Sequence, residues 1–134
     1  MNGTRPRLAV VGGPDIGLRL RLVQELGRRF DVCVLGSDRD AAPIFRRSDV
    51  EYRHYPLARR LSPGRDLLTV AALHRQFRSL KPEVVHTYDT KPSALGRLAA
   101  KMARVPVIVG TLPGLGSLYL TETVPTRAIR FIYE

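Results

Sequence analysis

The sequence predicts an α/β protein built on a doubly wound, Rossmann-like parallel sheet. Short apolar runs rich in β-branched residues recur along the chain, and most are followed by a segment with helical spacing. Alternation of this kind is typical of βαβ units, whose parallel strands are buried on both faces. Right-handed crossovers then favour the strand order 3-2-1-4-5. The expected strands cover residues 7–13, 31–37, 50–57, 82–87 and 106–111.

The connections in the first half are less uniform. Residues 16–30 place apolar side chains at helical spacing and predict a helix: Leu18, Leu22, Leu26 and Phe30. Residues 41–49 are interpreted as a plain connection. The run at 50–57 alternates well enough for a strand, and we expect it near the sheet edge.

The second half predicts two further helices. Residues 58–66 form a polar loop marked by proline and glycine. Residues 66–81 then place an apolar stripe on one helical face: Leu67, Val70, Leu73, Phe77 and Leu80. Residues 91–105 predict a helix with Pro92 in its first turn, where proline is favoured. A glycine-bearing loop at 112–123 precedes the start of another helix at 124–134.

Composition limits the class of protein. The 134 residues suffice for one compact domain with a real core. The single cysteine, Cys33, lies in an apolar run and is interpreted as a small core residue, so a reducing compartment is expected. The N-terminal apolar run is too short for a signal peptide or a membrane span. We therefore expect a cytoplasmic protein, or one peripheral to the inner face of a membrane.

The formal net charge of +10 is unevenly distributed. Between residues 53 and 81 Asp66 is the one acid among the following basic residues: Arg53, Arg59, Arg60, Arg65, Arg75, Arg78 and Lys81. Such a face suits nucleic acid, anionic lipid or phosphate-bearing substrates, and the alternative is a solvated surface without a partner.

Two polar loops are expected to meet where the strand order reverses, between the first and fourth strands, because ligands of doubly wound sheets bind there. The loop at 12–17 has Gly12 and Gly13, which allow close backbone approach, although it matches neither G-x-G-x-x-G nor a P-loop. Asp38 follows the second expected strand, where the acid that binds the ribose of a dinucleotide is found, but the signal for this role is weak.

The second loop has four polar residues in succession: Tyr88, Asp89, Thr90 and Lys91. The acid and the base could pair, Thr90 could cap the next helix, or the group could orient a hydroxylated substrate. His86 is interpreted as a packed residue rather than a base. The histidines and Cys33 have no metal-ligand spacing, so no metal site is predicted.

The stretch "KPEVVHTYDTKPSALGRLAAKMARVPVIVGTLPGLGSLY" at 81–119 resembles the N-terminal, acceptor-side domain of family-4 retaining GT-B glycosyltransferases. The bacterial members that act on lipid-linked sugars are the most similar. The shared features are the "KPDVVH"-type strand, the "T-x-K-P" turn, the Gly-Arg-Leu-Ala-Ala helix, the "VPVI" strand and the "T-x-x-G-L-G" loop. Many relatives have histidine where this chain has Tyr88, so no histidine-specific role is transferred.

The resemblance implies transfer of a sugar from a nucleotide-sugar co-substrate to a lipid-linked or polysaccharide acceptor, without a cofactor. It places Gly12 and Gly13 near the donor diphosphate. It places the acceptor side at Tyr88, Asp89, Thr90, Lys91, Gly114, Leu115 and Gly116. No catalytic residue is assigned. The donor-binding C-terminal domain would lie on a separate chain or be missing, so residues 1–134 are expected to form one truncated domain, inactive without it.

Two other classes stay open. A nucleotide-binding Rossmann reductase or epimerase would be favoured by a Tyr-x-x-x-Lys pair, but residue 92, four after Tyr88, is proline. A non-catalytic module would use the basic face to bind anionic lipid or DNA, of which nucleic acid is the less favoured partner.

Overall fold

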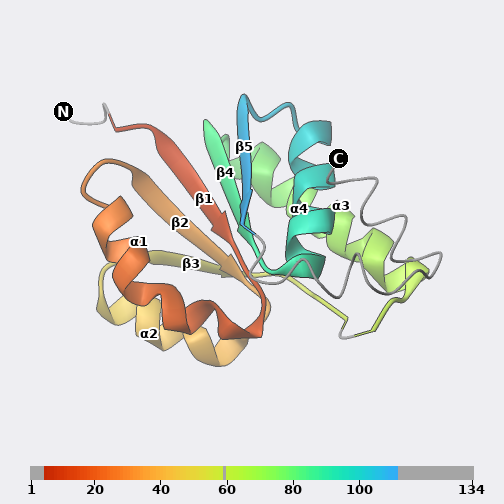
Figure 1. Cartoon of the computed structure of the whole chain (residues 1–134), viewed down its shortest axis with the longest axis horizontal. Coiled ribbons are helices and arrows are strands. Elements are labelled where there is room, and N and C mark those ends of the chain that lie inside the picture. The colour runs from red at the N-terminus through yellow and green to blue at the C-terminus, as the bar shows by residue number, and fades with distance from the viewer. Residues whose placement is uncertain (1–4, 59, 112–134) are drawn as a thin grey trace.

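The computed structural model describes residues 5–58 and 60–111, which form a sheet of five parallel strands (Figure 1). The sheet order is β3-β2-β1-β4-β5, which confirms the predicted topology. The order reverses between the adjacent strands β1 and β4. The strands are β1 (Arg7–Val11), β2 (Asp31–Gly36), β3 (Glu51–His54), β4 (Val84–Tyr88) and β5 (Val107–Thr111).

Helices cover both faces of the sheet, as the doubly wound fold requires (Figure 1). One face carries the 3₁₀ turn η1 (Pro14–Arg19), α1 (Leu20–Leu26), the 3₁₀ turn η2 (Arg39–Ala41) and α2 (Ala42–Arg47). The other face carries α3 (Pro63–Leu80) and α4 (Thr90–Met102), which pack side by side.

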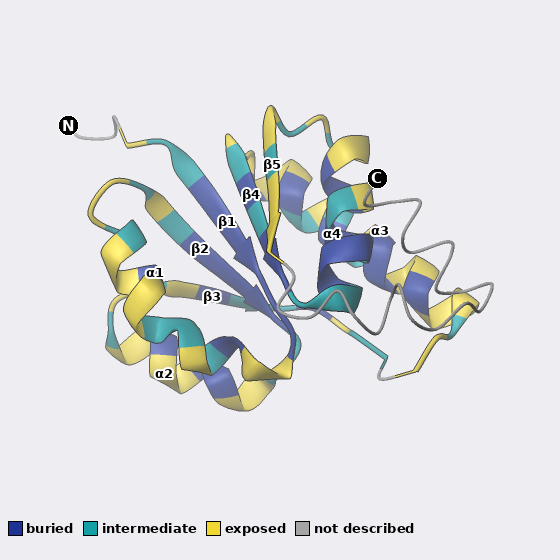
Figure 2. Cartoon of the chain, viewed as in Figure 1, coloured by how far each residue is buried: buried dark blue, intermediate teal, exposed yellow. Residues whose placement is uncertain are grey.

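The core divides into two apolar clusters, one on each face of the sheet. Alternate residues of the same strand belong to different clusters: Ala9 and Val11 lie with α3 and α4, whereas Leu8 and Val10 lie with α1 and α2. Figure 2 shows the resulting dark band of buried residues along the central strands. Cys33 is fully buried in the α3–α4 cluster, which confirms its interpretation as a core residue. Burial raises the pKa of its thiol to about 12.

The predicted helix at 16–30 differs from the structure in both length and phase. It begins as a 3₁₀ turn, and the α-helix covers only Leu20–Leu26. Because a 3₁₀ turn has fewer residues per turn than an α-helix, the stripe read at α-helical spacing rotates away from the sheet. Leu18 is 87% exposed, while Ile16 and Val23 are fully buried instead.

Other boundaries also differ from the sequence predictions, by the largest amounts around α2, β3 and α3. The expected connection at 41–49 contains α2, which buries Phe45 against Tyr52. The edge position of β3 is confirmed, but the strand ends at His54. α3 begins three residues early, because Pro63 starts a helix as readily as it marks a loop. Leu67 of its predicted apolar stripe faces solvent.

Several predictions fall outside the described residues. These are the loop at 112–123, with Gly114, Leu115 and Gly116, and the helix at 124–134.

Candidate functional site

A cleft of about 680 Å³ lies at the carboxyl ends of the strands, beside the reversal between β1 and β4. This is the edge at which doubly wound sheets bind ligands. Its walls come from the loops after β1, β2, β3 and β4. The lining residues are Gly13, Pro14, Asp15, Ser37, Asp38, Leu57, Ala58, Asp89, Lys91 and Pro92.

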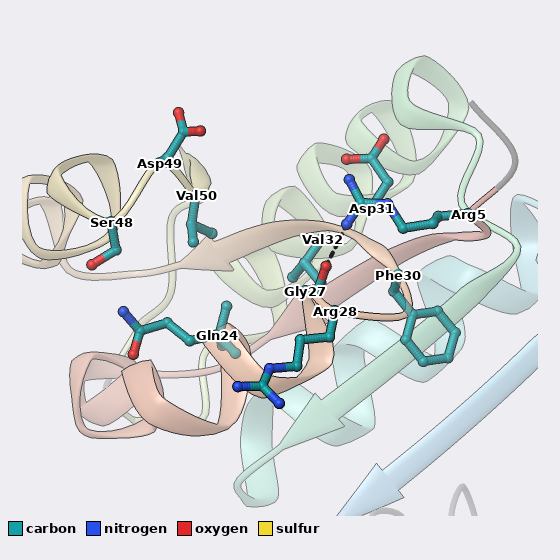
Figure 3. Close-up of a pocket in the computed structure, with 11 residues that line it drawn as sticks. Arg5, Gln24, Gly27, Arg28, Phe30, Asp31, Val32, Ser48, Asp49 and Val50 are labelled. Carbon is teal, nitrogen blue, oxygen red and sulfur yellow. Dashed lines mark hydrogen bonds between the residues drawn. The ribbon is translucent and has the colours of Figure 1, made fainter. Parts of the chain in front are cut away.

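A smaller pocket of about 340 Å³ lies at the opposite end of β2, between the end of α1 and the α2–β3 turn (Figure 3). Arg5 there donates a hydrogen bond to the carbonyl of Gly27. This pocket lies at the amino-terminal end of β2, whereas doubly wound sheets bind ligands at the carboxyl ends of their strands. We therefore do not assign the pocket to the candidate site.

Hydrogen bonds from both sides fix Gly12 in the loop after β1. Its N–H donates to the carbonyl of Leu35 over 3.0 Å, and its carbonyl accepts from the Tyr55 hydroxyl over 2.6 Å. Tyr55 is fully buried, and burial raises the pKa of its phenol, so it stays a donor. A Cβ at Gly12 would collide with Ile16. Space, not a left-handed backbone, therefore requires glycine at this position.

Gly13 lines the cleft, and its neighbours leave space for a Cβ atom at this position. A Cβ there would meet Asp89 and Pro92 only at 3.6 Å, an ordinary contact distance. Its N–H donates to Oδ2 of Asp89 over 3.4 Å, which joins the β1 loop to the β4 loop. The two loops that the sequence placed together are therefore in contact.

Asp89 has a strained backbone directly above β4. Its φ of 71° and ψ of 164° lie in a region that is almost restricted to glycine, at a cost of about 1–3 kcal/mol. Asp89, and not Thr90, occupies the N-cap position of α4, and it makes no side-chain cap bond. Its carboxylate faces Gly13 and the Arg19 guanidinium, 3.8 Å away. Strain of this kind is typical of functional positions.

The ammonium of Lys91 is fully engaged, although its side chain lines the cleft. Nζ donates to the carbonyls of Ala58 and Arg60, each over 2.6 Å, and pairs with Oδ1 of Asp66 at 2.8 Å. Lys91 therefore pairs with α3 and not with its neighbour Asp89. It ties the loop before α3 to the first turn of α4.

Tyr88 is buried and does not line the cleft. The Arg19 guanidinium lies 4.1 Å above its ring, and the ring of His86 stacks against it at 4.3 Å. His86 also forms a hydrogen bond with Thr111 over 2.8 Å. It is therefore packed and hydrogen-bonded, as expected, although it is half-buried and lies outside both core clusters. Burial and, to a smaller degree, Arg19 lower the pKa of its imidazole, which favours the neutral form.

Carboxylates dominate the charge of the cleft. Among the described residues that line it, Asp15, Asp38 and Asp89 are acids, whereas Lys91 is the one base and is paired with Asp66. The Asp38 side chain accepts a hydrogen bond from the backbone N–H of Asp40 and thereby caps η2. This arrangement suits hydroxyl groups, which donate to carboxylates, better than it suits an isolated anion.

The sequence patterns do not point to Arg19, Tyr55 or the Leu57–Ala58 wall of the cleft. Arg19 lies in a stretch where only the leucines show a period, and Tyr55 lies in the run that predicts a strand. Neither residue belongs to a recognisable sequence motif, so the spacing of residues does not identify either of them as part of a site.

Residues 16–132 match the family described as the Glycosyl transferase 4-like domain. A UDP-Gal:α-D-GlcNAc-diphosphoundecaprenol α-1,3-galactosyltransferase of Escherichia coli is 30% identical over 78 residues, which are 58% of this chain and 19% of that protein.

Two solved structures share the fold. UDP-GlcNAc 2-epimerase from Neisseria meningitidis, bound to UDP-GlcNAc, has a TM-score of 0.66 at 19% identity, over 94% of this chain and 37% of that one. MurG from Acinetobacter baumannii has a TM-score of 0.59 at 17% identity, over 78% and 34%.

The chain thus spans 19% of the curated relative and little more than a third of these solved chains. None of the helices within the described ranges is long and apolar enough to cross a bilayer. The family match begins inside η1, after Gly13, and covers β4 and most of the residues that line the cleft. The chain belongs to the Glycosyl transferase 4-like domain family.

Proposed function

We propose that this chain is the acceptor-binding half of a glycosyltransferase that uses a nucleotide-sugar donor. The observation that carries the proposal is the cleft at the β1–β4 reversal, where Gly13 meets the strained Asp89, in a chain of this family. The similar Escherichia coli protein is named for galactosyl transfer to a sugar on diphosphoundecaprenol. We extend the class, a polyprenyl-diphosphate-linked or glycan acceptor, to this chain, which then works at the cytoplasmic face of a membrane.

The carboxylates of the cleft suit the sugar of such an acceptor, whose hydroxyl groups are uncharged hydrogen-bond donors. Asp89 is only partly exposed, and its carboxylate can accept hydrogen bonds from sugar hydroxyls. Thr90 and Lys91 belong to the same side, Lys91 by holding the wall of the cleft in place. Tyr88 contributes through Arg19, which lies over its ring and faces Asp89. Gly114, Leu115 and Gly116 complete the acceptor side in this proposal.

The donor diphosphate would approach the backbone of Gly12 and Gly13. The described lining of the cleft offers three carboxylates and a lysine paired with Asp66, so the positive charge that balances a diphosphate must come from elsewhere. A second, donor-binding domain is the natural source. Sugar transfer also requires the anomeric carbon and the acceptor hydroxyl to be held together with water excluded, and a second domain can close over both.

Transfer from radiolabelled UDP-galactose to GlcNAc-diphosphoundecaprenol tests the proposal. We expect no turnover by the 134-residue chain alone and turnover once a family donor domain is supplied. Turnover by the chain alone would contradict the division into two halves.

Acceptor binding by the chain alone can be measured with a short-chain, water-soluble analogue of the same acceptor. Asp89→Asn should weaken binding by about tenfold or more, the value of a hydrogen bond to a charged group. Asp49→Asn is the matched control, since Asp49 is an exposed acid that also has positive φ, at 61°. Equal binding by both variants would remove Asp89 from the acceptor site.

A further inference from the structure

The side of the molecule formed by α3 and α4 is strongly basic. Its exposed basic residues are Arg60, Arg65, Arg75, Arg78, Lys81, Lys101 and Arg104. Of the acids in residues 60–111, Asp66 is buried against Lys91 and Asp89 faces Arg19, which leaves Glu83 exposed. The opposite half is mixed, because acids recur along it at Asp15, Glu25, Asp31, Asp38, Asp40, Asp49 and Glu51.

Three exposed leucines interrupt this basic surface at the start of α3. Leu61, Leu67 and Leu68, here called the leucine patch, are 56%, 70% and 66% exposed. Leu68 and Arg75 are seven residues apart, so they lie on the same side of the helix. In its first turns the outer surface of α3 (exposed positions in yellow in Figure 2) places Leu67 and Leu68 beside Arg65. In its last turns it presents Arg75 and Arg78.

We infer that the outer surface of α3 docks on an anionic lipid bilayer. Basic residues near such a surface are attracted by about 1 kcal/mol each, and exposed leucines gain by entering the boundary between headgroups and acyl chains. A nucleic-acid surface would not need exposed leucines among its basic residues. Among the described exposed residues of α3 there is also no aromatic side chain on which a base could stack.

Docking on this surface would bring the bilayer close to the cleft. The segment between β3 and α3 contributes Leu57 and Ala58 to the wall of the cleft and then continues into Leu61 of the leucine patch. Lys91 holds this segment through the carbonyls of Ala58 and Arg60. A molecule anchored in the membrane would therefore reach the cleft without leaving the bilayer.

Co-sedimentation of the 134-residue chain with vesicles tests this surface. Phosphatidylcholine vesicles with about 30% phosphatidylglycerol supply the anionic charge, and they contain no acceptor, so the outcome is independent of glycosyl transfer. Arg75→Gln with Arg78→Gln should weaken binding by about 25-fold, or about fivefold for each arginine. Leu67→Gln and Leu68→Gln should each lower the affinity for vesicles by about tenfold. Raising the salt from about 0.1 M to about 1 M should remove most of the affinity.

Matched variants on the opposite side of the sheet serve as controls. Arg46→Gln with Arg47→Gln changes the net charge equally on α2, and Leu18→Gln removes from η1 a leucine that is even more exposed, at 87%. These variants should bind vesicles within about twofold of the parent chain, because surface substitutions change little else. The inference is wrong if the controls lose as much as the α3 variants, or if neutral phosphatidylcholine vesicles bind equally well. It is also wrong if duplex DNA binds more tightly and the leucine variants have no effect, since the surface would then be a nucleic-acid site.

Discussion

Replacing Lys91 with methionine should lower the free energy of unfolding by about 3 kcal/mol. The substitution keeps an unbranched stem but removes the ammonium that serves the carbonyls of Ala58 and Arg60 and the carboxylate of Asp66. Breaking a buried ion pair by removing one partner costs about 3–5 kcal/mol. We take the lower end because the Lys91 side chain is 20% exposed, whereas that of Asp66 is 9% exposed.

Urea unfolding followed by far-ultraviolet circular dichroism measures this loss, which corresponds to about 10 °C in Tm for a domain of this size. Lys101→Met is the control, since Lys101 is an exposed lysine of the same helix and should change stability by less than about 0.5 kcal/mol.

Adding Asp66→Asn distinguishes an uncompensated charge from a simple loss of packing. If the cost of Lys91→Met comes from a buried, unpaired carboxylate, the double variant should be more stable than the sum of the two single losses by about 1–2 kcal/mol. Asp66 also accepts the Ser62 N–H over 3.2 Å, a bond that asparagine can still accept. Strict additivity, or a loss below about 0.5 kcal/mol for Lys91→Met, would refute the role of Lys91 as a buried tie.

Three further predictions concern other positions. Gly13→Ala should leave the fold equally stable or up to about 1 kcal/mol more stable, because its φ of −91° suits alanine, yet it should weaken binding of an acceptor analogue in the cleft; lowered stability in urea would contradict it. Cys33 should resist maleimide at pH 8 in the folded chain, since burial raises its pKa to about 12, and react only on unfolding. Burial opposes ionisation of Glu51, but Arg53 and Arg7 hold its folded pKa below the ordinary 4.5. The stability from this depressed pKa is present above pH 4.5 and is lost as the pH falls through the folded value; Glu51→Gln should remove that part of the acid transition, by less than about 1 kcal/mol because the group is exposed.

The strand order follows from the sequence because it depends on features that are local and redundant. Buried parallel strands are continuous apolar runs such as Val84–Val85, and each run is separated from the next by a helix-length segment. The crossover rule then leaves few topologies. Which face of a helix is buried is harder to predict from the sequence. A 3₁₀ start in η1 rotated the leucine stripe away from the sheet, and α2 is too short, at six residues, to show a period.

The meeting of Gly13 and Asp89 could be predicted for the same reason, since topology alone brings the ends of β1 and β4 together. The partners of the charged residues could not. Asp89 and Lys91 are two residues apart, but α4 starts between them, and their side chains reach Arg19 and Asp66 in different helical layers. Which cation meets which acid is decided by packing that no local pattern records.

The Asp89 carboxylate contacts Gly13 and Arg19, which stabilises the fold, but the Asp89 backbone is strained, which destabilises it. Asp89→Gly tests which of the two effects is larger. The Asp89 backbone costs about 1–3 kcal/mol in its region of φ and ψ, and glycine would relieve that cost. The contacts that it would lose are weak, a 3.4 Å bond from Gly13 and a 3.8 Å approach of Arg19 on a partly exposed side chain. We therefore expect Asp89→Gly to unfold at a higher urea concentration, with about 1 kcal/mol more stability, while acceptor binding falls. A carboxylate retained at a net cost to folding is best explained by a ligand, as in other trade-offs between stability and function. If Asp89→Gly were less stable than the parent chain, the carboxylate would be holding the two loops together, and the strain would need no functional explanation.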